Sequence, residues 1–207
     1  MADTKERILQ AALKLFAENG YEAVSVRDIA GQLSMTKAAL YKHYRNKRDI
    51  FQSILERMEQ RDAEQARLYD MPEGAPEETT EAWRSAGAEG ITGFGKAMFR
   101  YWTEDGFASR FRRMLTLEQY RDPEMGRLYQ QYLAAGPLGY MTDLFRAIAL
   151  PRAQEEAARF YAPMFLLYSV YDASEDKAAV LALLDGLLDE AGEHLKEIRK
   201  EGQDHAG

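Results

Sequence analysis

The stretch of sequence that decides the fold runs from Ser25 to Phe51 and reads SVRDIAGQLSMTKAALYKHYRNKRDIF. Ser25 and Asp28 have the spacing of a capping box, which predicts a short helix that begins after Ser25. Thr36 is a favoured residue before the first turn of a second short helix, and Asn46 has the same place before a third. Three helix starts so close together predict a compact group of helices.

The second of these short helices is expected to have one packed face and one free face. Leu40 and Tyr44 lie four residues apart, on the face that packs. The segment from Thr36 to Arg48 contains five basic residues and no acidic residue, which is the local charge that phosphate contacts require. A basic surface that only meets solvent has the same pattern, so charge alone leaves both interpretations open.

The sequence on either side of this stretch is also helical. Apolar residues follow helical spacing from Ile8 to Phe16, and Asn19-Gly20 predicts the end of that helix through a left-handed glycine. After Asn46, a longer helix is expected over residues 47–69. Residues 70–80, which contain Pro72, Gly74 and Pro76, predict a loop.

The second half of the chain predicts further helices and no strand. They are expected near residues 91–102, 107–115, 125–132 (entered through Asp122-Pro123), 153–171 (bent near Pro163) and 175–199 (after a Ser174 cap). Pro137 is expected to break or kink the helix that precedes it. The fold class is therefore all-α.

Charge is divided unevenly along the chain, whose formal net charge is -7. Residues 1–50 carry nine basic and six acidic side chains, whereas the remainder carries eighteen and twenty-eight. Any contact with nucleic acid is therefore expected in the N-terminal part. The N-terminus lacks the apolar core of a signal peptide and no apolar run approaches the length of a membrane span, which predicts a cytoplasmic protein without membrane contact.

Residues that would support catalysis or a cofactor are scarce. The chain has no cysteine, which excludes disulfides, zinc fingers and cysteine nucleophiles. Its three histidines, His43, His194 and His205, do not form a metal or nucleophile motif, and there is no phosphate-binding loop. Glu118 and Asp122 lie four apart, but acidic surface residues are common here. We expect no enzymatic activity, no metal and no cofactor.

Three segments, Ser25 to Ala30, Leu33 to Tyr44 and Asn46 to Phe51, together resemble the signature of TetR-family transcriptional regulators, within a match that spans roughly Lys5 to Leu55. The resemblance implies an N-terminal three-helix helix-turn-helix DNA-binding domain over residues 1–50. A helix over about 47–69 would connect it to a ligand-binding and dimerisation domain over 51–207 and transmit ligand binding.

The sequence departs from the commonest family pattern in two places. A glycine is frequent where this chain has Ser34, and Gly-Thr is frequent where it has Ala38-Ala39. The first difference is expected to alter the turn slightly. The second removes a hydroxyl group that could contact DNA.

The resemblance also implies which residues meet double-stranded operator DNA: Arg27, Thr36, Lys37, Ala38, Ala39, Tyr41, Lys42, His43 and Lys47. Lys37 is the candidate for base edges, while Ala38 and Ala39 permit close approach and offer methyl groups to thymine. The others are expected to contact phosphates and the DNA backbone. His43 fits an exposed helix position equally well, and Tyr44 is expected to pack.

Aromatic residues are concentrated in the larger domain, because nineteen of the twenty-three follow residue 50. This predicts a cavity for a small apolar or aromatic effector. Its candidate lining residues are Phe99, Trp102, Phe111, Tyr120, Tyr140, Phe145, Phe165 and Tyr168. The alternative is that these side chains simply fill the core.

The last helix has an apolar seam whose members alternate steps of three and four residues, as expected where helices pack side by side. It consists of Leu181, Leu184, Leu188, Ala191 and Leu195, followed by Ile198. Additional apolar positions beside the seam favour a homodimer interface here. The alternative places the seam against the protein's own core.

These features predict a ligand-responsive repressor that binds a near-palindromic operator as a homodimer and blocks the promoter. The alternative is a TetR-like interaction factor that works by binding another protein and uses DNA only as its anchor.

Overall fold

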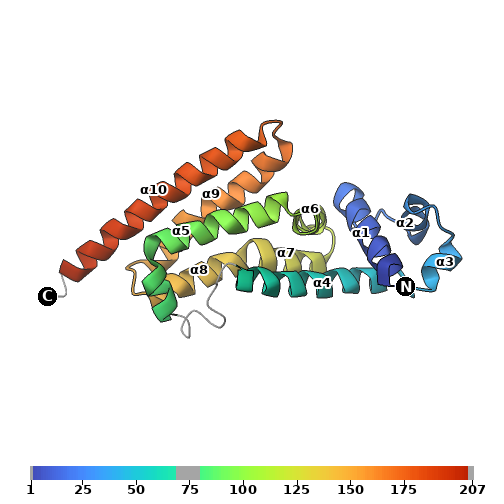
Figure 1. Cartoon of the computed structure of the whole chain (residues 1–207), viewed down its shortest axis with the longest axis horizontal. Coiled ribbons are helices and arrows are strands. Elements are labelled where there is room, and N and C mark those ends of the chain that lie inside the picture. Colours follow the sequence, from blue (N-terminus) through green and yellow to red (C-terminus); the bar gives the residue numbers. More distant parts are fainter. Residues whose placement is uncertain (1, 69–79, 205–207) are drawn as a thin grey trace. The chain divides into compact units, whose positions relative to one another are not determined.

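The computed structural model describes residues 2–68 and 80–204, and the side chains of residues 4–65 and 80–200. These residues form helices and no strand, as predicted. The helices (Figure 1) are α1 (Ala2–Asn19), α2 (Val26–Gln32), α3 (Lys37–Tyr41), α4 (Lys47–Leu68), α5 (Thr80–Glu104), α6 (Ala108–Glu118), α7 (Pro123–Leu133), α8 (Ala135–Ala147), α9 (Ala153–Ala173) and α10 (Lys177–Asp204). The predicted loop over 70–80 lies outside the described residues except for Thr80. No described helix has the length and apolar character that crossing a membrane requires.

The helix boundaries in the N-terminal part follow the local signals of the sequence. After α1, Gly20 adopts the predicted left-handed conformation, with φ at 88°. The hydroxyl of Ser25 accepts a hydrogen bond from the N–H of Asp28, and the Asp28 carboxylate accepts one from the N–H of Ser25, which completes the predicted capping box. Thr36 Oγ1 accepts the N–H of Ala39 at 3.1 Å and so caps α3.

Later boundaries confirm two predicted caps and correct one. Asn46 Oδ1 caps α4, and Asp122 Oδ1 caps α7. Ser174, which was expected to cap the last helix, instead ends α9, and Asp176 caps α10 by accepting the N–H of Ala179. The break expected at Pro137 comes earlier, at residue 134 between α7 and α8, so that the proline lies in the first turn of α8, where its missing N–H costs little.

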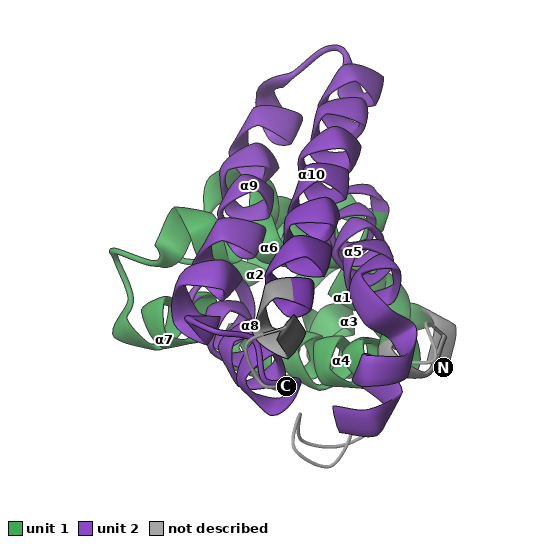
Figure 2. Cartoon of the chain, turned by 90° about the vertical axis from the view of Figure 1, so that its left-hand side faces the viewer, with its two compact units in different colours: residues 1–65, 105–129 green, residues 66–104, 130–207 purple. Residues whose placement is uncertain are grey.

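Contacts divide the chain into two compact units (Figure 2): residues 1–65 with 105–129, and residues 66–104 with 130–207. Unit 1 therefore contains α1 to α3, most of α4, α6 and the first part of α7. In this unit α6 packs against α1, and fully buried side chains such as Phe16, Ile29 and Ile54 form the core. The functional boundary at residue 50 stays a prediction, whereas the contacts place a distant segment, 105–129, with the N-terminal helices.

Unit 2 is built from α5, α8, α9 and α10, in which α9 packs on α8 and α10, and α5 packs on α10. Small residues bring these helices close together. A Cβ atom at Gly95 would lie 2.9 Å from the ring of Phe160, and one at Gly192 would lie 2.8 Å from Thr92. The close packing of α5 on α9 and α10 thus depends on residues without side chains.

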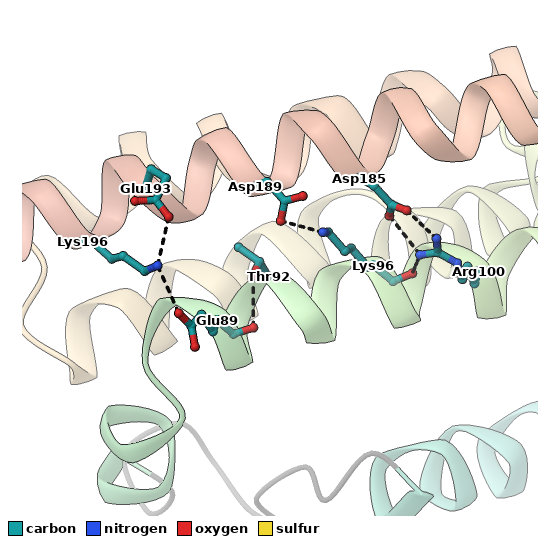
Figure 3. Close-up of polar contacts among 8 residues, drawn as sticks. All are labelled: Glu89, Thr92, Lys96, Arg100, Asp185, Asp189, Glu193 and Lys196. Atoms are coloured by element: carbon teal, nitrogen blue, oxygen red, sulfur yellow. Dashed lines mark hydrogen bonds and ion pairs between the residues drawn. The ribbon is translucent and has the colours of Figure 1, made fainter.

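A row of ion pairs, here called the ladder, joins α5 to α10 along their contact (Figure 3). Its rungs are Arg100 with Asp185 at 2.7 Å, Lys96 with Asp189 at 2.6 Å and Glu89 with Lys196 at 3.2 Å. As the residue number rises along α5, the number of its partner on α10 falls, so the two helices are antiparallel. Each partly exposed pair contributes little stability. However, α5 supplies the cation in two pairs and the anion in the third, so sliding one helix along the other would bring like charges together.

The apolar seam predicted on α10 is largely covered within unit 2, and its role in a dimer interface stays a prediction. Leu184, Leu188 and Leu195 are buried within the single chain, and Leu181 and Ala191 are half-buried. These side chains cover the protein's own core, the alternative that the spacing left open. The exposed apolar residues of this region are instead Phe165, Leu166 and Val170 on α9 and Leu183 on α10.

The candidate aromatic residues do not form one group. Tyr120 is 92% exposed and Phe165 is 44% exposed, so neither lines an interior site in this structure. Phe111 is buried in unit 1, whereas the remaining five belong to unit 2. Within unit 2, Phe99 and Tyr168 stack with ring centroids 5.0 Å apart. A ligand-binding role for the group in unit 2 stays a prediction.

The turn between α2 and α3 provides a test of local strain. Ser34 has a φ of 53°, in the left-handed region that favours glycine. We expect Ser34→Gly to raise the free energy of unfolding by about 0.5–1 kcal/mol, measured by urea denaturation. Ser34→Ala, which keeps the strain and removes the hydroxyl, is the control and should give no gain; equal stabilisation by both variants would contradict the strain argument.

Candidate DNA interface

Unit 1 presents α2 and α3 as two short helices joined by a tight turn. The N–H of Met35 donates to the carbonyl oxygen of Ala30 at 3.0 Å, which holds the turn closed. Leu40 is fully buried and anchors the inner face of α3. Tyr44 is buried as well, and its hydroxyl donates to the carbonyl oxygen of Lys5 at 3.3 Å, which confirms that it packs. The opposite face of α3 is left exposed.

Most of the predicted DNA-contacting residues lie on this exposed side of α2 and α3. The exposed ones are Arg27, Thr36, Lys37, Ala38, Tyr41 and Lys42, while Ala39 and His43 are half-buried. Lys37 Nζ lies 5.5 Å from the centre of the Tyr41 ring, so a cation and an aromatic hydroxyl are adjacent. The Thr36 hydroxyl accepts from the backbone and can still donate its own proton to a phosphate.

Lys47 differs from the other predicted contacts because its ammonium group has partners within the domain. Its Nζ donates to the carbonyl oxygens of Tyr21 at 2.9 Å and Glu22 at 3.4 Å, and it lies 4.2 Å from the centre of the Tyr21 ring. Lys47 thereby holds the chain after α1 against the start of α4. Its contact with DNA stays a prediction, and such a contact would compete with these bonds.

Two further basic residues of the cluster are neutralised by carboxylates. Arg45 pairs with Asp49 at 3.1 Å. Arg48 forms a bidentate pair with Glu124, with both N–O distances at 2.5 Å, and its guanidinium holds the pKa of the Glu124 carboxyl below its usual value. The sequence could not reveal the second pair, because its partners are 76 residues apart. Lys37 remains the exposed cation of α3 itself.

The segment 105–129 makes two other contacts with the N-terminal helices that sequence reasoning missed. Arg61 of α4 pairs with Asp105 at 2.5 Å. Glu118 of α6 is fully buried against Gly20, where any Cβ atom would collide with its carboxylate, and Arg121 lies 3.9 Å from that carboxylate. The glycine after α1 is thus required twice, for its left-handed conformation and for the approach of α6.

The Arg48–Glu124 pair predicts a dependence of stability on pH. The pKa of Glu124 is lowered on folding from 4.5, so the pair stabilises the fold above that pH and the contribution is lost as pH falls through the lowered pKa. Glu124→Gln should therefore reduce the free energy of unfolding at pH 7 by up to about 1 kcal/mol, because both groups are partly exposed. The difference from the natural chain should shrink below pH 4.5 in urea denaturation. A difference that is the same at every pH would contradict the ion pair as its cause.

Comparison with known proteins supports this reading of the N-terminal part. Residues 8–54 match the model of "Bacterial regulatory proteins, tetR family". The chain is 38% identical over 52 residues to the Staphylococcus epidermidis negative transcriptional regulator IcaR, and 43% identical over 56 residues to the Brucella suis transcriptional repressor BepR. Each match covers about a quarter of both proteins.

A likeness of fold extends over nearly the whole chain. The transcriptional regulator FadR from Bacillus subtilis, solved in complex with stearoyl-CoA, superposes with a TM-score of 0.59 over 90% of this chain and 96% of that one, at 17% identity. At this identity the likeness shows the fold alone. The helix-turn-helix geometry and the family match over residues 8–54 agree, and the N-terminal part of this chain is similar to bacterial regulatory proteins of the TetR family.

Proposed function

We propose that this protein is a cytoplasmic transcriptional regulator that binds a near-palindromic DNA operator as a homodimer and changes its affinity when a small ligand binds. The observation that carries the proposal is the exposed face of α3, where Lys37, Tyr41 and Lys42 lie beside the capping hydroxyl of Thr36. A helix of this kind fits the major groove, and its basic and hydroxyl groups suit base edges and phosphates.

The exposed face of α9 and α10 supports the dimer. Leu166 is 64% exposed and Leu183 is 53% exposed, and Phe165 and Val170 lie beside Leu166 on α9. A two-fold interface uses the same patch on both chains, and an apolar helical face of this kind is suited to a second copy. We propose this outer face, in place of the buried α10 seam, as the contact between the two subunits.

The interior of unit 2 supports an apolar effector. Its aromatic side chains include the stacked pair Phe99 and Tyr168, and Phe145 packs edge-to-face on Phe160 with ring centroids 6.0 Å apart. FadR, which shares the fold, has been solved with stearoyl-CoA, a ligand with a long apolar chain. Ligand binding would release the operator; IcaR and BepR, to which the N-terminal part is similar, are a negative regulator and a repressor of transcription.

The first test is selection of bound sequences from a random DNA pool, followed by titration of the enriched sequence. An inverted repeat should be enriched, and its affinity should fall steeply with salt. Lys37→Ala should weaken binding about tenfold or more and relax the sequence preference. Arg45→Ala, which removes an exposed cation already paired with Asp49, is the matched control and should bind much more tightly than Lys37→Ala. If no DNA sequence is enriched and both variants bind DNA like the natural chain, the proposal that this protein is a DNA-binding regulator fails.

The dimer is tested by placing charge on the outer face. Leu166→Glu and Leu183→Glu should each convert the dimer to a monomer in light scattering, because a carboxylate at the interface must lose its hydration without a partner. Tyr120→Glu, on an almost fully exposed side chain of unit 1, is the control and should leave the mass unchanged. A dimer that survives both leucine variants would place the interface elsewhere.

A further inference from the structure

The first turns of α5 are set at an angle to the rest of the helix (Figure 1). Gly87 causes the kink, with φ at 63° and ψ at -165°, and nothing lies within 4 Å of the place where its Cβ would be. Between Glu81 and Ala86, Trp83 is the single buried residue, whereas the other five side chains are exposed. Residues 80–86, here called the lid, are therefore the first turns of α5, set off from the rest of the helix by Gly87, with Trp83 as the buried side chain.

Trp83 is inserted among aromatic side chains. It is 3% exposed, and its ring centre lies 5.7 Å from that of Phe94, which in turn lies 6.5 Å from that of Tyr140. Both neighbours are half-buried, so this aromatic site is close to the surface. Arg84 of the lid also contacts α8, because its Nη2 donates to the carbonyl oxygen of Ala147 at 3.3 Å.

The indole N–H of Trp83 is buried without a hydrogen-bond acceptor. The Tyr140 hydroxyl is near enough for the indole to lower its pKa, against the larger effect of burial, which raises that pKa. The two groups nevertheless do not reach hydrogen-bonding geometry. A buried donor without an acceptor costs free energy, and a ligand that supplied an acceptor would recover it.

We propose that residues 80–86 open about Gly87 and that the aromatic site formed by Trp83, Phe94 and Tyr140 binds a neutral, planar aromatic molecule that carries a hydrogen-bond acceptor. The three rings offer flat apolar surfaces, which favour stacked or edge-on contact with another ring. They carry no charge, so an ionic ligand would lose its hydration there without compensation. The Trp83 N–H would orient the ligand by donating to its acceptor atom.

Such a ligand would be the effector of the regulator proposed above, on whose function this assignment rests. The test measures ligand binding without DNA, so that the two proposals can fail separately. Naphthalene and quinoline are the probes, because they have nearly the same shape and only quinoline has an acceptor nitrogen. Calorimetric titration into the full chain, at a pH where quinoline is neutral, should show quinoline binding about fivefold tighter, the ratio that one neutral hydrogen bond provides.

Trp83→Phe keeps a ring and removes the N–H, so it should bind both probes with equal affinity. Trp102→Phe removes the only other indole in the chain and should retain the preference for quinoline. Thermal unfolding of both variants shows that they are folded. Failure of both probes to bind the natural chain, equal affinity of the two for it, or a preference that survives in Trp83→Phe would each overturn the proposal.

Labelling with 5-fluorotryptophan gives an independent readout of the lid. The chain has two tryptophans, so its fluorine spectrum contains two assignable resonances. Quinoline should shift the Trp83 resonance while that of Trp102 changes little. If the Trp102 resonance alone shifts, the ligand binds elsewhere and the lid assignment is wrong. Loss of operator binding, measured separately, would overturn the regulator and leave the ligand site standing.

Discussion

The position of the DNA-binding helices depends on the attachment of α1 and α4 to the segment 105–129. Arg48, in the first turn of α4, is held bidentately by Glu124, and Arg61 further along α4 is held by Asp105. Between these pairs the end of α1 receives the buried Glu118 at Gly20. With α4 held at two points and the end of α1 at a third, neither helix can shift within unit 1 without breaking one of these contacts.

The same attachment changes how a signal can travel along the chain. The family resemblance assigned transmission to the helix that connects the domains, here α4. The contacts, however, divide the chain so that it passes between the units at three places, after residues 65, 104 and 129. The second and third passages lead directly into the segment that carries Asp105 and Glu124. The segment that holds Arg48 and Arg61 of α4 is therefore joined to unit 2 by the chain at both of its ends.

How much of the structure can be predicted from the sequence depends on how many residues separate the two partners of each interaction. Caps at Ser25, Thr36, Asn46 and Asp122 involve residues two or three positions apart, and all four were predicted. The exposed face of α3 was predicted for the same reason, because helical spacing separates Leu40 from its neighbours. The pair of Arg48 with Glu124 spans 76 residues, and no local pattern indicates it. Two cations that the sequence assigned to a phosphate-binding surface, Arg48 and Lys47, consequently have internal partners.

The α10 seam shows a different limit. Apolar spacing of three and four residues indicates that a helix packs against another surface. It does not indicate whether that surface belongs to the same chain or to a second subunit. Leu184 and Leu188 pack within the chain because Gly95 on α5 leaves room for them: a Cβ there would lie 3.2 Å from Leu188. The apolar side chains that remain exposed include Leu166 on α9 and Leu183 on α10. An exposed apolar face costs solubility unless it is covered, and the proposed homodimer would cover it with the same face of a second copy.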